Sequence, residues 1–221
     1  MARGTAEAAV SPDGSVGTGR RRSRTNLLQP RGAVETRSLL KVRLRTERLL
    51  LRPPRKSDAS ALFEIFADPQ VTRYLSRPAW TTLDQSRERI AQDLEAMAAG
   101  TYLRLVVVRR ADRELIGECS LFNFVERAKR AEVGYALSRK SWGNGYLNEA
   151  LRSFLEFAFS KLGLNRVEAD IDPRNRASAR SLERLGFTRE GHLRQRWIVA
   201  GEVSDSDLYG LLRSDWRGGR V

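Results

Sequence analysis

Cysteine and histidine each occur only once in the 221 residues, and this scarcity excludes several kinds of site. A single cysteine cannot build an internal disulfide framework, and one cysteine with one histidine is too few for a thiolate or imidazole metal cage. We therefore expect no metal. No apolar run approaches the roughly 20 residues that span a bilayer, and the first residues lack the apolar core of a secretory signal. These absences predict a cytoplasmic protein without a membrane segment.

Positive charge, in contrast, is abundant, with 40 Lys and Arg against 27 Asp and Glu and a formal net charge of +13. Residues 1–45 hold ten basic residues and only three acidic ones. The stretch is rich in Gly, Ser and Thr and shows no sustained periodicity, so we predict a disordered basic extension at residues 1–42, followed by a folded domain at 43–218. Such a tail could contact nucleic acid or a ribosome weakly. A solvated tail without a partner is the alternative that we favour.

The folded part has the pattern of an α/β protein. Strands are expected at 48–52, 102–109, 114–122, 131–137 and 166–171, with a C-terminal hairpin over 187–212. Helices are expected from Asp58 and from Thr82, then over a strongly apolar stretch from Leu147 to Leu162, and finally from Asn175 or Ser178.

The segment between the strand at 131–137 and the apolar helix contains two glycines, Gly143 and Gly145. Glycine lets the backbone turn sharply and approach a ligand, and the first N–H groups of a helix are unpaired and lie at the positive end of its dipole. The arrangement favours a diphosphate site that needs no metal. A tight connection without a ligand is the alternative. Because GxGxxG and GxxxxGK[ST] are both absent, neither an NAD site nor an NTPase site is indicated.

Two motifs, AEVGYALSRKSWGNGYLNEAL and, about thirty residues later, DPRNRASARSLERLGFTREG, resemble the GCN5-related N-acetyltransferases. The resemblance is strongest to the RimJ/RimL-type branch, which acetylates the N-termini of ribosomal proteins, and it extends from about Thr46 to Trp216. It implies the GNAT fold, a mixed and mostly antiparallel sheet of about six to seven strands flanked by about four helices. It also implies acetyl-CoA as co-substrate, an amine acceptor that is a protein N-terminus or a small molecule, direct attack in a ternary complex, and a monomer or homodimer.

The resemblance assigns the cofactor site residue by residue. The diphosphate loop begins with Lys140, where the family usually has Gln or Arg, and the backbone of residues 133–137 would pair with the pantetheine arm like an added strand. Asn175 and Ser178 match the second motif near the sulfur, although Asn175 could be a plain helix cap. The expected cofactor contacts are Val133, Gly134, Tyr135, Ala136, Leu137, Lys140, Trp142, Gly143, Asn144, Gly145, Tyr146, Asn175 and Ser178.

Acetyl transfer to an amine needs a base for the ammonium proton and a group that stabilises the departing thiolate. The candidate catalytic residues are Asp170 or Glu132, acting as base through water, and Ser178 on the thiol side. Alternatively, the enzyme relies mainly on positioning its substrates, without a dedicated base. Glu168 shares a strand face with Asp170, so the two lie together on either a cleft face or a solvated face. Gly134 could mark a strand distortion that offers its N–H to the oxyanion.

Two features of the resembled enzymes are missing. The tyrosine acid of one relative falls on Leu182, and the glutamate base of another falls on Trp197. Two alternative functions therefore stay open. One is a catalytically inactive acyl-CoA-binding protein, and the other is a nucleic-acid-associated protein that acts through its basic tail.

Overall fold

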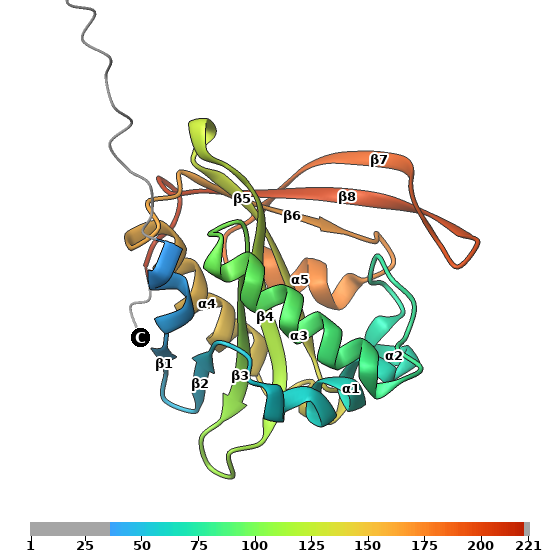
Figure 1. The fold of residues 1–221 in the computed structure, drawn as a ribbon. Helices are drawn as coiled ribbons and strands as arrows, with labels where there is room; N and C mark the ends of the chain where they lie inside the picture. Colours follow the sequence, from blue (N-terminus) through green and yellow to red (C-terminus); the bar gives the residue numbers. More distant parts are fainter. Residues whose placement is uncertain (1–35, 219–221) are drawn as a thin grey trace, which may run out of the picture. The chain divides into compact units, whose positions relative to one another are not determined.

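The computed structural model describes residues 36–218, and these form one sheet with helices on both faces (Figure 1). In chain order the elements are η1 (Thr36–Lys41), β1 (Leu44–Arg45), β2 (Leu49–Arg52), η2 (Lys56–Asp58), α1 (Ala59–Ala67), α2 (Pro69–Thr72), α3 (Leu83–Ala98), β3 (Leu103–Arg109), β4 (Leu115–Val125), η3 (Glu126–Ala128), β5 (Arg130–Leu137), η4 (Arg139–Ser141), α4 (Tyr146–Ser160), β6 (Arg166–Ile171), α5 (Arg176–Arg184), β7 (Thr188–Val199) and β8 (Glu202–Leu212).

The sheet has eight strands in the order β1-β2-β3-β4-β5-β6-β8-β7, and only β5 and β6 pair in parallel. The predicted mixed, mostly antiparallel sheet is confirmed. The strand and helix counts are one higher than expected. The additional strand is β1, two residues that pair with β2, and the additional helix is α2, which begins at Pro69. Elements this short carry no periodicity that a sequence pattern could reveal.

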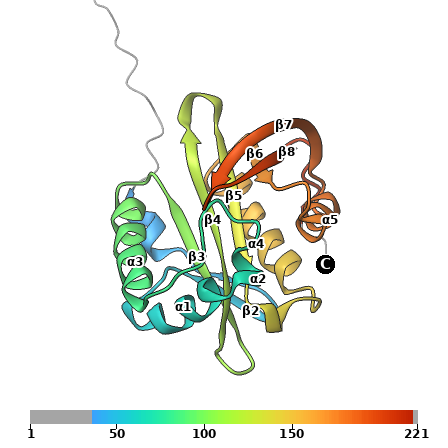
Figure 2. The same ribbon diagram turned by 90° about the vertical axis from the view of Figure 1, so that its right-hand side faces the viewer.

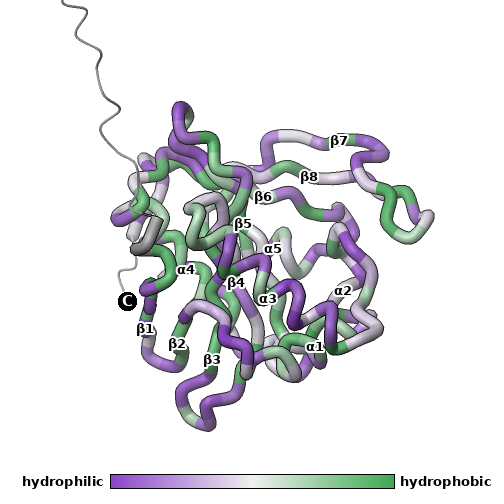
Figure 3. The backbone as a smooth tube through the Cα atoms, in the orientation of Figure 1, coloured by the Kyte–Doolittle hydropathy of each residue, from purple (hydrophilic) through white to green (hydrophobic). Residues whose placement is uncertain are grey.

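Helices cover the sheet on both faces, with α1 and α3 on one side and α4 and α5 on the other (Figure 2). Alternate strand residues point to opposite faces, so each face has its own apolar cluster. Phe66 of α1 and Val106 of β3 belong to the first cluster, while Phe154 of α4 and Val167 of β6 belong to the second. The hydrophobic stretches in Figure 3 follow β3 and α4, in keeping with their burial.

The folded part begins earlier than predicted. The composition predicts residues 36–42 to be part of the disordered extension, but Thr36–Lys41 form η1, and Leu39 and Val42 are only 2% and 7% exposed. Both pack in the same cluster as Met97 of α3. The domain boundary at residue 43 is therefore placed too late, because burial of these two apolar side chains anchors the segment. Residues 1–35 of the predicted extension lie outside the described residues.

The pairing between β5 and β6 is short. It covers Arg130 to Glu132 on β5 and Arg166 to Glu168 on β6, after which the two strands no longer pair. Beyond this point β6 continues against β8, and β5 continues against β4. The sheet thus divides between β5 and β6. Within residues 36–218, no helix has the length and apolar character needed to cross a bilayer.

Candidate functional site

Where the sheet divides, one edge of β5 carries backbone groups without a neighbouring strand. The N–H of Ser138 donates to the carbonyl of Ile116 at 2.8 Å, which fixes the alternation of the β4–β5 ladder. Even-numbered residues of β5 therefore pair with β4, and Val133, Tyr135 and Leu137 direct their N–H and C=O groups the other way. Val133 adjoins the last residues that pair with β6, Glu132 and Glu168, so the groups of Tyr135 lie beyond the end of that pairing. The Leu137 carbonyl accepts a hydrogen bond from the indole N–H of Trp142 at 2.9 Å.

The glycine loop lies between this edge and the first turn of α4. Gly143 and Gly145 both have left-handed backbones, with φ of 77° and 76°, and Gly145 caps the helix. A side chain at Gly143 would meet no protein atom within 4 Å, so the space beside it is open. The loop therefore exposes the unpaired N–H groups of a helix start, as the predicted anion site requires.

A second cation at the loop was missed by the sequence reasoning. Arg48, just before β2, donates from Nη1 to the Asn144 carbonyl at 3.0 Å and from Nε to the Glu149 carboxylate at 2.6 Å. Its guanidinium carbon lies 4.6 Å from the centre of the Tyr146 ring. Arg48 precedes Asn144 by almost a hundred residues, so no local motif could have revealed this contact. The positive charge and the loop are held together by the fold.

Glu149 fixes this arrangement from the first turn of α4. Its carboxylate accepts hydrogen bonds from the Thr46 hydroxyl at 2.5 Å and from the Arg48 N–H at 2.9 Å. Burial alone would raise the pKa of Glu149, but these hydrogen bonds and the Arg48 charge outweigh it and hold the pKa below its usual range. The carboxylate therefore stays ionised and keeps Arg48 oriented at the loop.

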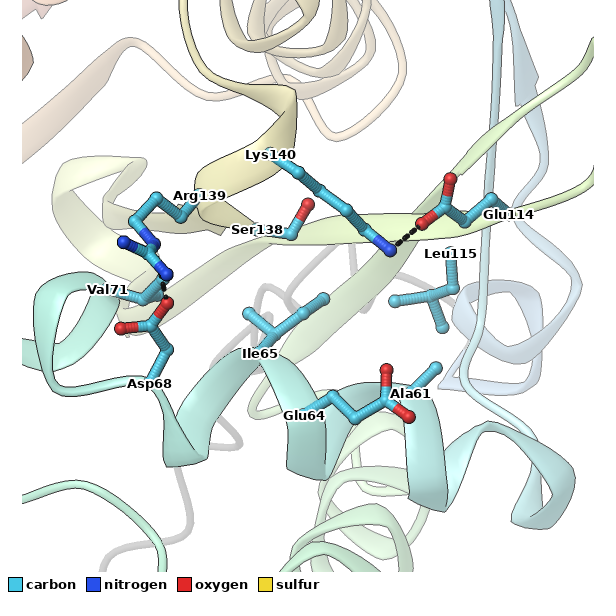
Figure 4. A pocket seen from close by; sticks show the side chains of 10 residues that line it. All are labelled: Ala61, Glu64, Ile65, Asp68, Val71, Glu114, Leu115, Ser138, Arg139 and Lys140. Atoms are coloured by element: carbon cyan, nitrogen blue, oxygen red, sulfur yellow. Dashed lines mark ion pairs between the residues drawn. The ribbon is translucent and has the colours of Figure 1, made fainter.

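Lys140, the expected cation of the loop, points elsewhere in this structure. Its ammonium pairs with Glu114, which raises the pKa of Lys140. The pair lies at the edge of a cavity of about 500 Å³ beside α1, where Arg139 also pairs with Asp68 at 3.1 Å (Figure 4). The cation that contacts the glycine loop is Arg48.

The second motif places two hydroxyl groups together. Asn175 Oδ1 accepts the Ser178 N–H at 3.1 Å, so Asn175 caps α5, as the plainer of the two interpretations expected. The Ser178 hydroxyl lies 2.6 Å from the Tyr135 hydroxyl. Burial raises the pKa of Tyr135, so its hydroxyl keeps its proton at neutral pH. Sequence reasoning considered only the backbone of Tyr135, because its partner is on a distant helix.

A cavity of about 430 Å³ lies on the α1 and α3 face of the divided sheet, and we call it the central cavity. Its walls come from the segment 69–79 after α1, from the ends of β4, β5 and β6, and from the β7–β8 hairpin. Glu132 and Asp170, the two predicted bases, both line it. The fold therefore brings together two carboxylates that are far apart in the sequence.

The two carboxylates have different partners. Glu132 accepts a hydrogen bond from the Asn123 amide at 3.0 Å. Asp170 accepts one from the Trp197 indole at 3.4 Å and lies 3.6 Å from Arg196. Trp197 stands where the resembled enzyme has its glutamate base. Here its indole N–H is a partner of Asp170.

Glu168 shares the face of Asp170 but not its surroundings. Its carboxylate pairs with Arg130 and also with Arg166, the latter at 2.7 Å. These pairs hold the β5–β6 junction together, so Glu168 is a structural residue.

The expected distortion at Gly134 is wrong. The β4–β5 register runs unbroken from Gly117 to Phe122, and its irregularity lies between Phe122 and Val125. A side chain at Gly134 would come within 3.1 Å of both Ser120 and Phe122, so close packing explains the glycine. Because Gly134 is even-numbered, its N–H faces β4. The N–H groups that face the gap beyond the β6 pairing belong to Tyr135 and Leu137.

Among residues 36–218, no group of three or more His, Cys, Asp or Glu side chains is placed to hold a metal ion. The ionisable groups of the site are carboxylates, guanidiniums and tyrosines.

Comparison with known proteins gives a consistent result. Residues 48–188 match the family model described as an acetyltransferase (GNAT) domain. The chain is 35% identical over 176 residues to the uncharacterised N-acetyltransferase p20 of Bacillus licheniformis, covering 79% of this chain and 98% of that protein. It is 28% identical over 188 residues to the [ribosomal protein uS5]-alanine N-acetyltransferase of Escherichia coli, covering 81% and 95%.

Solved structures agree with these matches. The ribosomal-protein-S5-alanine acetyltransferase of Vibrio fischeri superimposes with a TM-score of 0.70 at 25% identity, covering 80% of this chain and 99% of that one. Together with the divided sheet and the glycine loop, these matches show that the chain belongs to the GNAT family of N-acetyltransferases.

Proposed function

We propose that this enzyme transfers the acetyl group of acetyl-CoA to a primary amine on a protein N-terminus, of the kind found on ribosomal proteins, or on a small molecule. The observation that carries the proposal is the unpaired edge of β5, which joins the glycine loop on one side to the central cavity on the other. Such an edge can pair with an extended ligand as a sheet pairs with a strand.

The described residues fit acetyl-CoA, which supplies a thioester as the acyl donor. The N–H groups at the start of α4, with Arg48 beside them, suit a diphosphate. The C=O of Val133 and the N–H and C=O of Tyr135 suit the amides of a pantetheine arm. Gly143 leaves open space for a ligand to approach the backbone.

The residues of the central cavity can prepare the amine. Asp170 or Glu132, directly or through water, takes the proton that the ammonium must lose before its nitrogen attacks the thioester carbon. An N–H on the open edge of β5 can stabilise the oxyanion that forms. The carbon–sulfur bond then breaks, and the Tyr135 hydroxyl, hydrogen-bonded to Ser178, can give its proton to the thiolate.

The acceptor is supported by similarity. The E. coli relative acts on an alanine N-terminus of ribosomal protein uS5, and it aligns over 81% of this chain. A protein N-terminus could reach the central cavity as an extended peptide lying between the segment 69–79 and the β7–β8 hairpin. A cytoplasmic location and a weak ribosome contact through residues 1–35 would accord with such an acceptor.

The proposal is tested by incubating the full chain with acetyl-CoA and a panel of N-terminal peptides and small amines, with CoA release and acetylated product measured together. We expect stoichiometric formation of both for at least one primary amine. Tight CoA binding with no acetylated product from any amine would instead support an inactive acyl-CoA-binding protein.

The two carboxylates of the central cavity can be separated by their amide variants. We expect Asp170→Asn to lower kcat/KM by about 10²–10³-fold at neutral pH, the scale of general base catalysis, and Glu132→Gln to lower it less than tenfold. Glu168→Gln, on the same strand face as Asp170, serves as the control. Because a lost base is replaced in part by hydroxide, the Asp170 variant should recover activity as the pH rises. Equal losses in both variants, without such recovery, would show that neither residue is the base.

A further inference from the structure

Arg77 lies in the wall of the central cavity and has an unusual environment for a guanidinium. It is partly buried, and its guanidinium carbon lies 4.5 Å from the centre of the Phe66 ring and 5.2 Å from that of Trp80. In the described part of the chain it takes part in no ion pair and no side-chain hydrogen bond. A partly buried cation without a carboxylate partner is costly, so its place beside the cavity calls for an explanation.

The other arginines of the cavity are compensated or solvated. Arg174 pairs with Asp172 and Glu202, each at 2.6 Å, and Arg196 lies 3.6 Å from Asp170. Arg73 is exposed to solvent. Arg77 therefore combines burial with the lack of a partner, a combination not shared by these three.

Glu118 is the carboxylate whose charge acts most strongly on Arg77, but it already has an ion-pair partner. Glu118, on β4, is itself bound by Arg104 at 2.5 Å. Burial and the neighbouring Arg89 charge lower the pKa of Arg77 to about 10. The group still carries its charge at neutral pH, and an incoming anion would relieve the unfavourable surroundings.

The aromatic rings on which Arg77 lies give it a defined position. Phe66 and Trp80 are themselves in contact, with ring centres 4.8 Å apart, and both are buried. A guanidinium stacked on aromatic rings keeps its edge N–H groups free, and these match a carboxylate in a two-point hydrogen-bonded pair. The cavity thus presents a cation in one part of its wall and the Glu132 and Asp170 carboxylates in another.

We propose that Arg77 binds a carboxylate of the acceptor, so that the enzyme selects primary amines that carry an acidic group near the amine. The proposal rests on the acetyl transfer proposed above. The amine would lie toward Glu132 and Asp170 while the carboxylate pairs with Arg77. A short peptide with an acidic side chain and a small amino acid offer the same chemistry, and the volume of about 430 Å³ is within the ~300–1,000 Å³ typical of ligand pockets.

Matched acceptors that differ only in charge test this inference. The first set comprises Ala-Glu-Ala-Ala and Ala-Gln-Ala-Ala as C-terminal amides, with further pairs that place the acidic residue third or fourth. The second comprises 4-aminobutanoate and 4-aminobutanamide. We expect the wild-type protein to favour the acid of at least one pair by tenfold or more in kcat/KM. The pair that shows the preference distinguishes a peptide from a small molecule.

Variants of Arg77 connect the preference to this side chain. Arg77→Gln should bring the acid-to-amide ratio close to one by lowering kcat/KM for the acid, while Arg77→Lys should keep part of the ratio. Arg87→Gln is the control, because Arg87 is exposed on α3 and pairs with Asp84. Thermal unfolding of each variant monitors the loss of the aromatic packing.

The other possible results either refute the inference about Arg77 or support it. A wild-type ratio near one for all pairs, or a ratio that Arg77→Gln leaves intact, overturns the inference while acetyl transfer itself stands. If no amine is acetylated, the proposed function fails, and the same peptides are titrated into the CoA-bound protein by calorimetry. Tighter binding of the acid that disappears in Arg77→Gln would still support the inference, and equal or absent binding of acid and amide would refute it.

Discussion

Replacing Gly143 by aspartate is expected to raise the dissociation constant for coenzyme A by at least about 100-fold, equivalent to roughly 2.7 kcal/mol of binding free energy. The space beside Gly143 is open in the protein, so the new side chain would project to where the diphosphate is proposed to lie. A carboxylate there would compete for the N–H groups of α4 and repel the ligand. Calorimetric titration with coenzyme A measures the effect.

Gly163 at the other end of α4 provides a matched control. It has a left-handed backbone like Gly143, with φ of 68° against 77°, and a side chain would likewise meet nothing within 4 Å. Gly163→Asp should therefore cause a similar strain of about 1 kcal/mol, but it should leave the affinity for coenzyme A unchanged. Equal affinity in the two variants would mean that the glycine loop does not hold the diphosphate.

Arg104→Met is expected to lower the free energy of unfolding by about 3–5 kcal/mol, the usual cost of breaking a buried charge pair. Arg104 is 2% exposed, and it pairs with Glu118 at 2.5 Å and with Asp93 at 3.1 Å. Burial alone would lower the pKa of Arg104, but the charges of these partners and of Tyr102 outweigh it and raise the pKa. Without the guanidinium, Glu118 would be left buried and unpaired, and Asp93 would keep only its pair with Arg89 at 2.9 Å.

The loss should appear as a fall in Tm of roughly 6–20 °C, at about 2–4 °C per kcal/mol for a domain of this size. Arg87→Met, which breaks the exposed pair with Asp84, should cost less than about 1 kcal/mol. Adding Glu118→Gln to Arg104→Met should recover part of the stability, since it removes one unpaired charge. A loss below 1 kcal/mol in Arg104→Met would contradict the role assigned to this cluster.

Local patterns explain how much of the fold could be predicted. The apolar stripe of α4, the turn between β3 and β4, and the hairpin of β7 and β8 each depend on residues near one another in the sequence, and all are confirmed. The glycine loop is local too, so its left-handed backbone at Gly143 and Gly145 follows from residue type. The two-residue β1 and the burial of Leu39 depend on packing against other elements.

The site was harder to predict, because its decisive contacts join distant segments. Alternation on β6 put Glu168 and Asp170 on one face but could not show that Arg130 and Arg166 bind the first of them. The contact between Tyr135 and Ser178 links β5 to α5, across 43 positions of sequence. The first contacts lie where β5 and β6 pair and the second where they no longer do, and no pattern in either strand reveals that boundary.

The carboxylates of the central cavity and most of its wall come from different parts of the fold. Its carboxylates stand on β5 and β6, whereas much of its wall comes from the segment 69–79 and the β7–β8 hairpin. Substitutions in the loop residues 73–79 of this wall can change which amines enter and leave the chemistry at the sheet undisturbed, because loops tolerate exchange better than paired strands. An ancestral protein with this arrangement could give rise to homologues that use the same acyl donor and acetylate unrelated amines.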